Sequence, residues 1–277
     1  MPPSYYFNLN PDAPMFGILE REKPEWWTII CKDHDLYINI RKQNHINVYY
    51  NGASVMELYY PNKKLAALIH PKYLDSDWNA KPKEYYKTQP EKIVAGLKRI
   101  KNNINNVYKK GKNNNEGGCE KEIQGRLYIN GEYIDTEYSF VYEDPRLIIR
   151  IDLTTIREDG MIEFVELKRI SDNRLLKKED SEKEPEILKQ MSDYNRFIND
   201  YRQDIEEYYK KIQKIMRSIG VNNPLAYREI KGVSSQARLL FAGYANGDPN
   251  HVRRRERVER IKELLDANNI VSNINEI

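Results

Sequence analysis

The chain of 277 residues is long enough for one or two domains at about 150 residues each, which excludes a small scaffold held together by disulfides. Hydrophobic residues make up 40% of the sequence and charged residues 31%, as in soluble globular proteins. No apolar run reaches the ~18 residues of a membrane-spanning helix, and the first residues lack the features of a signal peptide. We therefore expect a cytoplasmic protein with no membrane partner.

The metal chemistry open to the chain is limited by its composition. Two cysteines and four histidines, without C-x-x-C or H-x-x-x-H spacing, predict neither a disulfide framework nor a zinc site, so any metal ion should bind oxygen ligands. With 45 Lys and Arg against 42 Asp and Glu, the net charge is only +3, and nucleic-acid binding would depend on where the charges lie. The 21 tyrosines indicate either a compositional bias or a surface on which bases stack.

Short β-prone segments follow one another from residue 26 to about residue 74, and they predict an antiparallel meander. The segments are WWTIIC, LYINI, INVYY, SVMELYY and LAALIH. In the first of them, Trp26 and Trp27 should point to opposite sides of the sheet. Asn51 and Gly52 suit the two central positions of a type I′ hairpin turn. We place a β-rich domain at residues 1–90, with target recognition as one role and plain packing or a dimer interface as the alternative.

Residues 91–114 are expected to form a basic amphipathic helix and a linker. Apolar side chains recur at helical spacing from Ile93 to Val107, and lysines and arginines lie between them. Lys98 and Lys101 are candidates for contacts with a nucleic-acid backbone, and a solvated helix face is the alternative. The segment GKNNNEGG disfavours a helix, so we place the domain boundary there.

Residues 115–277 combine helices and strands. A short helix is expected at about residues 119–128, followed by a strand at 133–142 and by the strands RLIIRIDLTTI and MIEFVELKRI. A long helix after Pro185 should break once, and the strand ARLLFAGY follows it. These patterns predict an α/β domain.

A last helix is expected at about residues 251–267. It is rich in arginine and glutamate, and Arg257 is one of these arginines. The alternation of the two charges favours salt bridges between residues four apart on an exposed surface over a nucleic-acid interface.

Three side chains on the two apolar strands of this domain could carry chemistry. Glu166 and Lys168 end the second strand and point to the same face, and Asp152 lies in the first. If the strands are neighbours, the carboxylates of Asp152 and Glu166 would favour a divalent cation between them. Mg²⁺ suits such oxygen ligands, and Lys168 could then orient a water or stabilise negative charge during phosphodiester hydrolysis. The alternative is an ordinary salt-bridged strand edge.

The order of these elements resembles that of the PD-(D/E)xK nuclease superfamily. In that family a helix with Glu is followed by a strand, a second strand with Asp, a third strand with Glu-x-Lys, and another helix. Glu120 looks like the acidic residue in the first helix of archaeal Holliday-junction resolvases, with Glu122 as the alternative. Ile151 stands where the family name has proline, a change that many members share. The resemblance covers about residues 115–245.

A further motif, Gln190-x-x-x-Tyr194, is similar to that of the RecB-like branch of the superfamily. The two side chains share one helix face, although Tyr194 also continues an apolar stripe that suits a core residue.

The resemblance implies a restriction-endonuclease-like fold, with a mixed central sheet flanked by helices, and a metal-dependent endonuclease. The catalytic residues that it implies are Glu120, Asp152, Glu166, Lys168, Gln190 and Tyr194. The ligands that it implies for Mg²⁺, which Mn²⁺ can replace, are Glu120, Asp152, Glu166 and the carbonyl of Leu167. DNA is the expected substrate, and restriction or antiviral defence is the role expected by analogy. A catalytically inactive module that binds nucleic acid or a partner protein is the alternative.

Arginines flank the motif strands and could hold phosphates on either side of the site, or else face solvent. They are Arg146, Arg150, Arg169 and Arg174. The expected partner is therefore nucleic acid, and a homodimer or a larger defence complex is compatible with the sequence.

Overall fold

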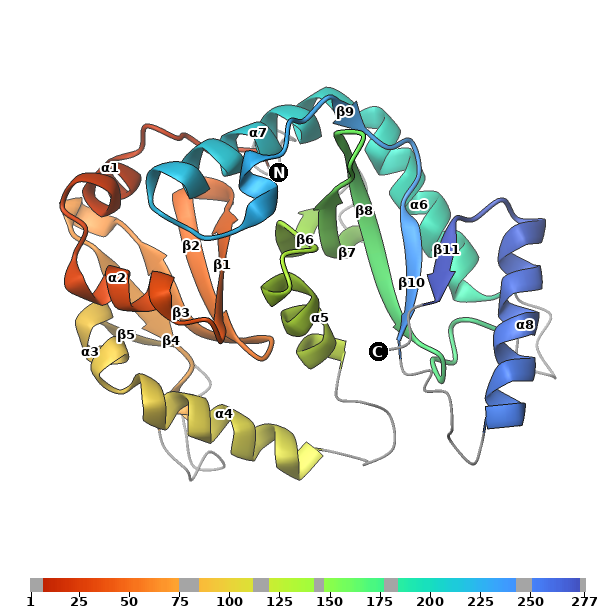
Figure 1. Ribbon diagram of the computed structural model, residues 1–277, viewed down its shortest axis with the longest axis horizontal. Helices are drawn as coiled ribbons and strands as arrows, with labels where there is room; N and C mark the ends of the chain where they lie inside the picture. The colour runs from red at the N-terminus through yellow and green to blue at the C-terminus, as the bar shows by residue number, and fades with distance from the viewer. Residues whose placement is uncertain are drawn as a thin grey trace.

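The computed structural model describes residues 7–74, 85–111, 120–141, 147–176, 184–242 and 251–274. Two β-sheets lie side by side (Figure 1). Helix α7 (Arg202–Ser218) joins them, because it contacts β1 (Leu36–Arg41) of the first sheet and β9 (Gly232–Val233) of the second. The chain is thus an α/β protein, as predicted. Over the described ranges, no helix has the length and apolar character needed to cross a membrane.

The first sheet is an antiparallel meander, as the sequence predicts for four of its five strands, and its last strand lies beyond residue 74, where no strand was expected. Its strands pair in chain order, and they are β1, β2 (His45–Tyr50), β3 (Ala53–Tyr59), β4 (Ala66–Ile69) and β5 (Tyr86–Thr88). The helices that surround it are α1 (Pro14–Arg21), α2 (Glu25–Lys32), α3 (Pro90–Ala95) and α4 (Leu97–Gly111). The expected basic helix is therefore two helices, which meet at Gly96.

The first predicted strand is wrong, because WWTIIC lies in helix α2. Trp26 and Trp27 are both buried, whereas a strand would point them to opposite sides. Pro24 caps the helix, and the burial of Trp27 together with Ile30 outweighs the β propensity of these residues. The indole of Trp27 also donates a hydrogen bond of 2.8 Å to the carbonyl of Ile219, which fixes α2 to the end of α7.

The β2–β3 turn is the expected type I′ turn, since Asn51 has φ 48° and Gly52 has φ 77°. The turn lies against helix α5 (Glu120–Ile129), whose first residue is the candidate Glu120. A Cβ atom at Gly52 would lie 2.4 Å from the carbonyl oxygen of Lys121, so only glycine fits here. The first sheet thus sets the position of the helix that carries Glu120.

Replacing Gly52 with alanine should lower the free energy of unfolding by about 3 kcal/mol, because the left-handed backbone and the clash with Lys121 both oppose the side chain. Gly220→Ala is the matched control: Gly220 also has φ 77°, and an added Cβ would meet nothing within 4 Å. It should lose only about 1 kcal/mol from backbone strain. Urea unfolding measures both, and equal losses would contradict the role of the contact with α5.

The second sheet is mixed. Its main strands are β6 (Asp135–Val141), β7 (Ile148–Ile156), β8 (Met161–Arg169), β10 (Arg238–Ala242) and β11 (Ser272–Ile274). Antiparallel pairs join β6 to β7 and β7 to β8, whereas β8, β10 and β11 are parallel. The predicted long helix consists of α6 (Glu186–Asp200) and α7, with the expected single break at Tyr201. The last helix, α8 (His251–Ala267), is also where the sequence predicts it.

Helices cover both faces of this second sheet. On one face, Ile123 of α5 packs in a buried cluster with Val165 and Leu167 of β8. On the other, the rings of Phe164 and Phe197 lie 6.2 Å apart, which places α6 against β8. Because side chains alternate along a strand, the even-numbered residues that follow Phe164 on β8 also face α6.

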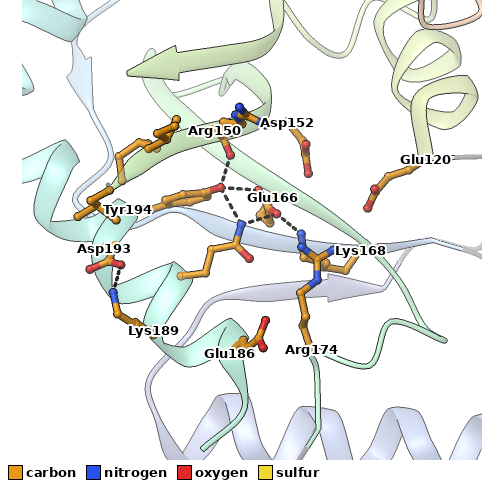
Figure 2. A pocket seen from close by; sticks show the side chains of 14 residues that line it. Glu120, Arg150, Asp152, Glu166, Lys168, Arg174, Glu186, Lys189, Asp193 and Tyr194 are labelled. Atoms are coloured by element: carbon orange, nitrogen blue, oxygen red, sulfur yellow. Dashed lines mark hydrogen bonds and ion pairs between the residues drawn. The ribbon is translucent and has the colours of Figure 1, made fainter. Parts of the chain in front are cut away.

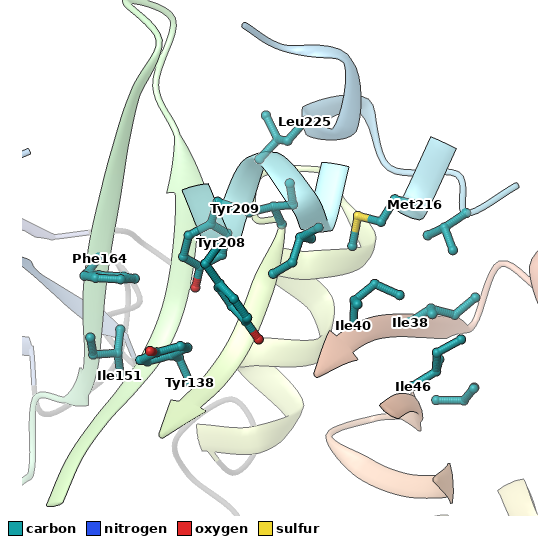
Figure 3. Close-up of a cluster of buried hydrophobic side chains, with 14 of the residues drawn as sticks. Ile38, Ile40, Ile46, Tyr138, Ile151, Phe164, Tyr208, Tyr209, Met216 and Leu225 are labelled. Carbon is teal, nitrogen blue, oxygen red and sulfur yellow. The ribbon is translucent and has the colours of Figure 1, made fainter. Parts of the chain in front are cut away.

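One hydrophobic core continues from the first sheet into the second. Figure 3 shows Ile40 of β1, Met216 of α7, and Tyr138 and Phe164 of the second sheet as members of this core. The predicted domain boundary at residues 111–118 lies, apart from residue 111, outside the described residues. The amino-terminal part therefore packs directly on the part that was expected to be a nuclease domain.

Polar contacts also tie the sheets together. Arg41 of β1 forms a buried ion pair with Asp135 of β6, and Asp135 accepts a hydrogen bond of 2.8 Å from the N–H of Thr136. Beside them, the amide of Asn39 donates to the hydroxyl of Thr136 at 2.7 Å. β1, the first strand of one sheet, is thus fixed to β6, the first strand of the other.

Candidate active site

Strands β7 and β8 separate at the position of the two predicted carboxylates. Their ladder ends at the pair Leu153 and Val165. Beyond it, the main-chain N–H of Leu167 donates a hydrogen bond of 3.0 Å to Oδ2 of Asp152, so a side chain takes the place of a main-chain acceptor. Asp152 and Glu166 line one cavity here (Figure 2).

The cavity has a volume of about 570 Å³. All six predicted catalytic residues line it: Glu120, Asp152, Glu166, Lys168, Gln190 and Tyr194. They come from α5, β7, β8 and α6, so the fold brings together side chains from four elements. Glu120 is part of this lining, and its alternative Glu122 is not.

Glu166 and Lys168 form a buried ion pair on the face of β8 that α6 covers. Each residue is 2% exposed. Lys168 Nζ donates to Oε1 of Glu166 and lies 3.4 Å from the carbonyl oxygen of Leu167. The desolvation of two charges buried this deeply costs several kcal/mol, which a surface salt bridge does not incur. This burial distinguishes the pair from a salt bridge at an exposed strand edge.

Gln190 and Tyr194 hold the Glu166 carboxylate from the side of α6. Gln190 Nε2 donates to Oε1 of Glu166 at 2.7 Å and to the hydroxyl oxygen of Tyr194 at 2.8 Å. That hydroxyl lies 2.9 Å from Oε2 of Glu166 and also close to the carbonyl of Arg150, and its one proton serves one acceptor at a time. Burial, followed by the charge of Glu166, raises the pKa of Tyr194, so the hydroxyl remains a donor at neutral pH.

The acidic side chains of the cavity repel one another. Burial, and next the charge of Glu166, raise the pKa of Asp152 well above its ordinary value, while Lys168 opposes this rise. Burial also raises the pKa of Glu120; Lys168 lowers it, and Glu166 adds to the rise. Additional positive charge in the cavity would therefore stabilise the ionised carboxylates.

The oxygen atoms of the cavity fit a magnesium ion that keeps part of its water shell. In the part of the chain that the structure describes, no three acidic, histidine or cysteine side chains form a group that could hold an ion, so Glu120 does not complete a three-carboxylate site. Mg²⁺ is usually bound by one or two carboxylates together with waters and phosphate oxygens. Asp152, Glu166 and the carbonyl of Leu167 supply such a partial set, and the repulsion between the two carboxylates favours a cation.

Asp152→Asn should stabilise the metal-free protein at pH 8. Because the pKa of Asp152 is raised in the folded state, the stability of the wild type falls as the pH rises from the ordinary carboxyl value toward the raised one. Asparagine removes this loss and keeps an oxygen acceptor for the N–H of Leu167. In EDTA we expect a melting temperature about 3 °C above that of the wild type at pH 8, and a smaller difference at pH 5.

Asp172→Asn is the control with the opposite sign. Burial acts to raise the pKa of Asp172, but the hydrogen bonds and charge of Arg174 outweigh it, and the net pKa is lowered. The ionised carboxylate of Asp172 therefore stabilises the fold at pH 8, and this variant should melt below the wild type. A loss of stability in Asp152→Asn at pH 8 would contradict the electrostatic description of the cavity.

The predicted phosphate-binding arginines take different positions. Arg150 and Arg174 are exposed and line the cavity, and Figure 2 shows Arg174 beside Lys168. Arg169 is half-buried at the end of β8 and does not belong to the lining. Arg146 lies outside the described residues. Two of the four thus lie where a substrate that enters the cavity would meet them.

The two predicted lysines of α4 differ from each other. Lys101 Nζ lies 2.7 Å from Asp33 Oδ1 and 2.9 Å from Asp35 Oδ2, so its charge is used to hold α4 to the segment after α2. Lys98 is exposed. Neither lysine lines the cavity.

Sequence reasoning missed three charged residues of α6 that line the cavity. They are Glu186, Lys189 and Asp193. Lys189 is 76% exposed and forms an ion pair of 2.5 Å with Asp193, one turn further along. The available signal for Glu186 and Asp193 was their spacing of four and three residues from Gln190, because helix neighbours at i±3 and i±4 share a face, and Lys189 is four residues from Asp193.

Comparisons of the chain with models of protein families, with curated proteins and with solved structures found no match. A functional conclusion therefore depends on the chemistry of this cavity and on the order of the elements that build it. That order is α5, β6, β7, β8, α6 and, after α7 and β9, β10.

Proposed function

We propose that the protein is a magnesium-dependent nuclease of the PD-(D/E)xK type that hydrolyses phosphodiester bonds in DNA. The main support is the convergence of Asp152, Glu166 and Lys168 in one cavity. A helix with Glu120 precedes these strands, and a helix with Gln190 follows them, in the order that the family resemblance implies.

Asp152, Glu166 and the Leu167 carbonyl would hold the Mg²⁺ ion, and Glu120 lines the same cavity. When bound, the ion would supply an activated water and neutralise charge on the phosphoryl group. These oxygens are the hard ligands that Mg²⁺ and Mn²⁺ both accept.

The protein's own side chains then have separate roles. Lys168 carries a buried positive charge, which stabilises negative charge more strongly than a solvated one would, and it can orient the attacking water. Gln190 and Tyr194 are positioning residues, since their hydrogen bonds fix the Glu166 carboxylate. Arg174 has an exposed guanidinium at the cavity, which suits a phosphate next to the one that is cleaved.

One observation favours the alternative, a nuclease-like module that binds nucleic acid without cutting it. The Lys168 ammonium already pairs with Glu166, so part of the negative charge is neutralised within the protein. Against this, burial of an ion pair seldom stabilises a fold more than apolar side chains of similar size would. A purely structural site has no need of Glu166 and Lys168, whereas a catalytic site requires both.

The test is an incubation of the purified protein with plasmid DNA, a single-stranded oligonucleotide and a matched RNA, each with Mg²⁺, Mn²⁺ or EDTA. We expect DNA cleavage with either ion and none in EDTA. Binding without cleavage under every condition would support the inactive module. If the protein neither binds nor cleaves any of these nucleic acids, both functions are contradicted.

A further inference from the structure

The turn that follows β8 delivers Arg174 to the cavity. The Arg174 guanidinium forms hydrogen bonds of 2.5 to 3.1 Å with the Asp172 carboxylate, and the N–H of Arg174 donates to the same carboxylate at 2.9 Å. These contacts close a compact loop six residues beyond Lys168. The position of the guanidinium therefore depends on how firmly the main chain at Asp172 is held.

Arg257, on the distant helix α8, holds that main chain. Its Nε donates a hydrogen bond of 2.7 Å to the carbonyl of Ile170, and its Nη2 donates one of 2.9 Å to the carbonyl of Asp172. The two donors of one rigid guanidinium thus bridge two carbonyls of a single turn. A lysine at this position could not reproduce that geometry.

The sequence predicts a different role for Arg257, a surface salt bridge between residues four apart. Arg255 on the same helix does form such a bridge, 3.3 Å from Glu259, and it is exposed. Arg257 is half-buried, and burial together with the charge of Arg260 lowers its pKa. Partial burial of a guanidinium costs free energy, which the hydrogen bonds to the two carbonyls offset. Arg257 therefore has a structural role and does more than keep the surface soluble.

The turn that Arg257 holds carries Arg174, whose charge interacts with the charged groups of the cavity. Arg174 lines the cavity together with Lys168 and Glu120, and Figure 2 shows its side chain extending toward them. After Asp172, the carboxylates of Glu120 and Glu166 are the charges that raise the pKa of Arg174, so the guanidinium lies within electrostatic reach of the proposed reaction centre.

We propose that Arg257 is a positioning residue that clamps the turn at Ile170 and Asp172, so that Arg174 faces the cavity and binds a phosphate of the substrate next to the cleaved one. The proposal rests on the proposed nuclease function. It gives the last helix a part in substrate binding through a turn that is 85 residues away in the sequence.

The first test is independent of any substrate. Hydrogen exchange of the wild type, Arg257→Met and the control Arg255→Met should show faster exchange at residues 170–175 in Arg257→Met alone, with unchanged protection in β8 and β10. Arg257→Lys should give an intermediate rate, because it restores one donor and the charge. If the turn in Arg257→Met is protected from exchange as strongly as in the wild type, Arg257 does not hold the turn and the proposal is wrong.

The second test measures the binding of a fluorescently labelled DNA duplex in EDTA, where cleavage does not occur, over a range of salt concentrations. Arg174→Met should weaken binding about 10-fold and reduce the slope of log Kd against log salt by about 1. Arg257→Met should show the same change of slope, and the double variant should be no weaker than Arg174→Met.

The outcomes separate the possible failures. Additive effects of the two substitutions, or an unchanged slope in Arg257→Met, would overturn the link between Arg257 and Arg174. A wild type that neither binds nor cuts DNA would instead contradict the proposed function, and the exchange experiment would still decide whether the clamp exists. Arg255→Met should match the wild type in both tests, because its salt bridge lies on the exposed side of α8.

Discussion

Glu166→Gln and Lys168→Met should each lower the rate of DNA cleavage by about 10²–10³-fold or more. Glu166 supplies one of the two strand carboxylates, and Lys168 is the buried cation beside it. The amide of glutamine cannot supply the negative charge that would hold the Mg²⁺ ion, and the thioether of methionine cannot supply the positive charge that would stabilise the phosphoryl group. Single-turnover cleavage of a labelled duplex at saturating Mg²⁺ measures the effect on the chemical step, and full activity in either variant would contradict the proposed mechanism.

A double variant separates loss of chemistry from loss of fold. Each single substitution leaves one buried charge without its partner, so each should also lower the melting temperature. In Glu166→Gln with Lys168→Met both charges are removed, and the neutral glutamine can still bond to Gln190 and Tyr194. We expect the double variant to regain most of the stability and none of the activity. Recovery of activity together with stability would show that the pair is structural.

Arg41→Met should lower the free energy of unfolding by about 3–5 kcal/mol, because it leaves Asp135 charged and without its cation in the core between the two sheets. Burial already raises the pKa of Asp135 above its ordinary value even with Arg41 present. Removal of the cation should raise it further, so the loss of stability should grow as the pH increases. Urea unfolding at pH 5 and pH 8 measures both the size and the sign of this dependence.

The matched control is Arg157→Met. Arg157 pairs with Asp159 at the surface, where both side chains are nearly half exposed, and lies 3.8 Å from Glu163, so its removal should cost much less stability than removal of Arg41. A second variant, Arg41→Met with Asp135→Leu, removes both buried charges and should recover stability relative to Arg41→Met. Equal losses in Arg41→Met and Arg157→Met would contradict the view that the two sheets form one cooperative unit.

The parts of the site that the sequence predicts best are those that lie within one element. Glu166 and Lys168 share a face because they are two residues apart on a strand, and Gln190 and Tyr194 share one because they are four apart on a helix. Their meeting in one cavity is a property of the tertiary structure. Periodicity carries no information about it, and the expectation depended on the family resemblance.

The elements that the sequence misjudges are those whose conformation is set by distant partners. α2 is helical because Trp27 reaches the end of α7, a contact across 192 residues, although its residues favour a strand. Arg257 was expected on an exposed, salt-bridged helix face, but it binds the carbonyl of Ile170, which lies 87 residues away in the sequence. The β2–β3 turn, in contrast, follows from Asn51 and Gly52 alone, because a two-residue turn needs only its own backbone angles.

The most direct test of the proposed metal site is a crystal structure of the protein with Mn²⁺, in which the ion is located by its anomalous scattering. We expect one strong peak in direct contact with the carboxylates of Asp152 and Glu166, and no peak there in Asp152→Asn. A cavity without a peak at saturating Mn²⁺, with the Lys168 ammonium still paired to Glu166, would contradict the metal site and with it the proposed nuclease.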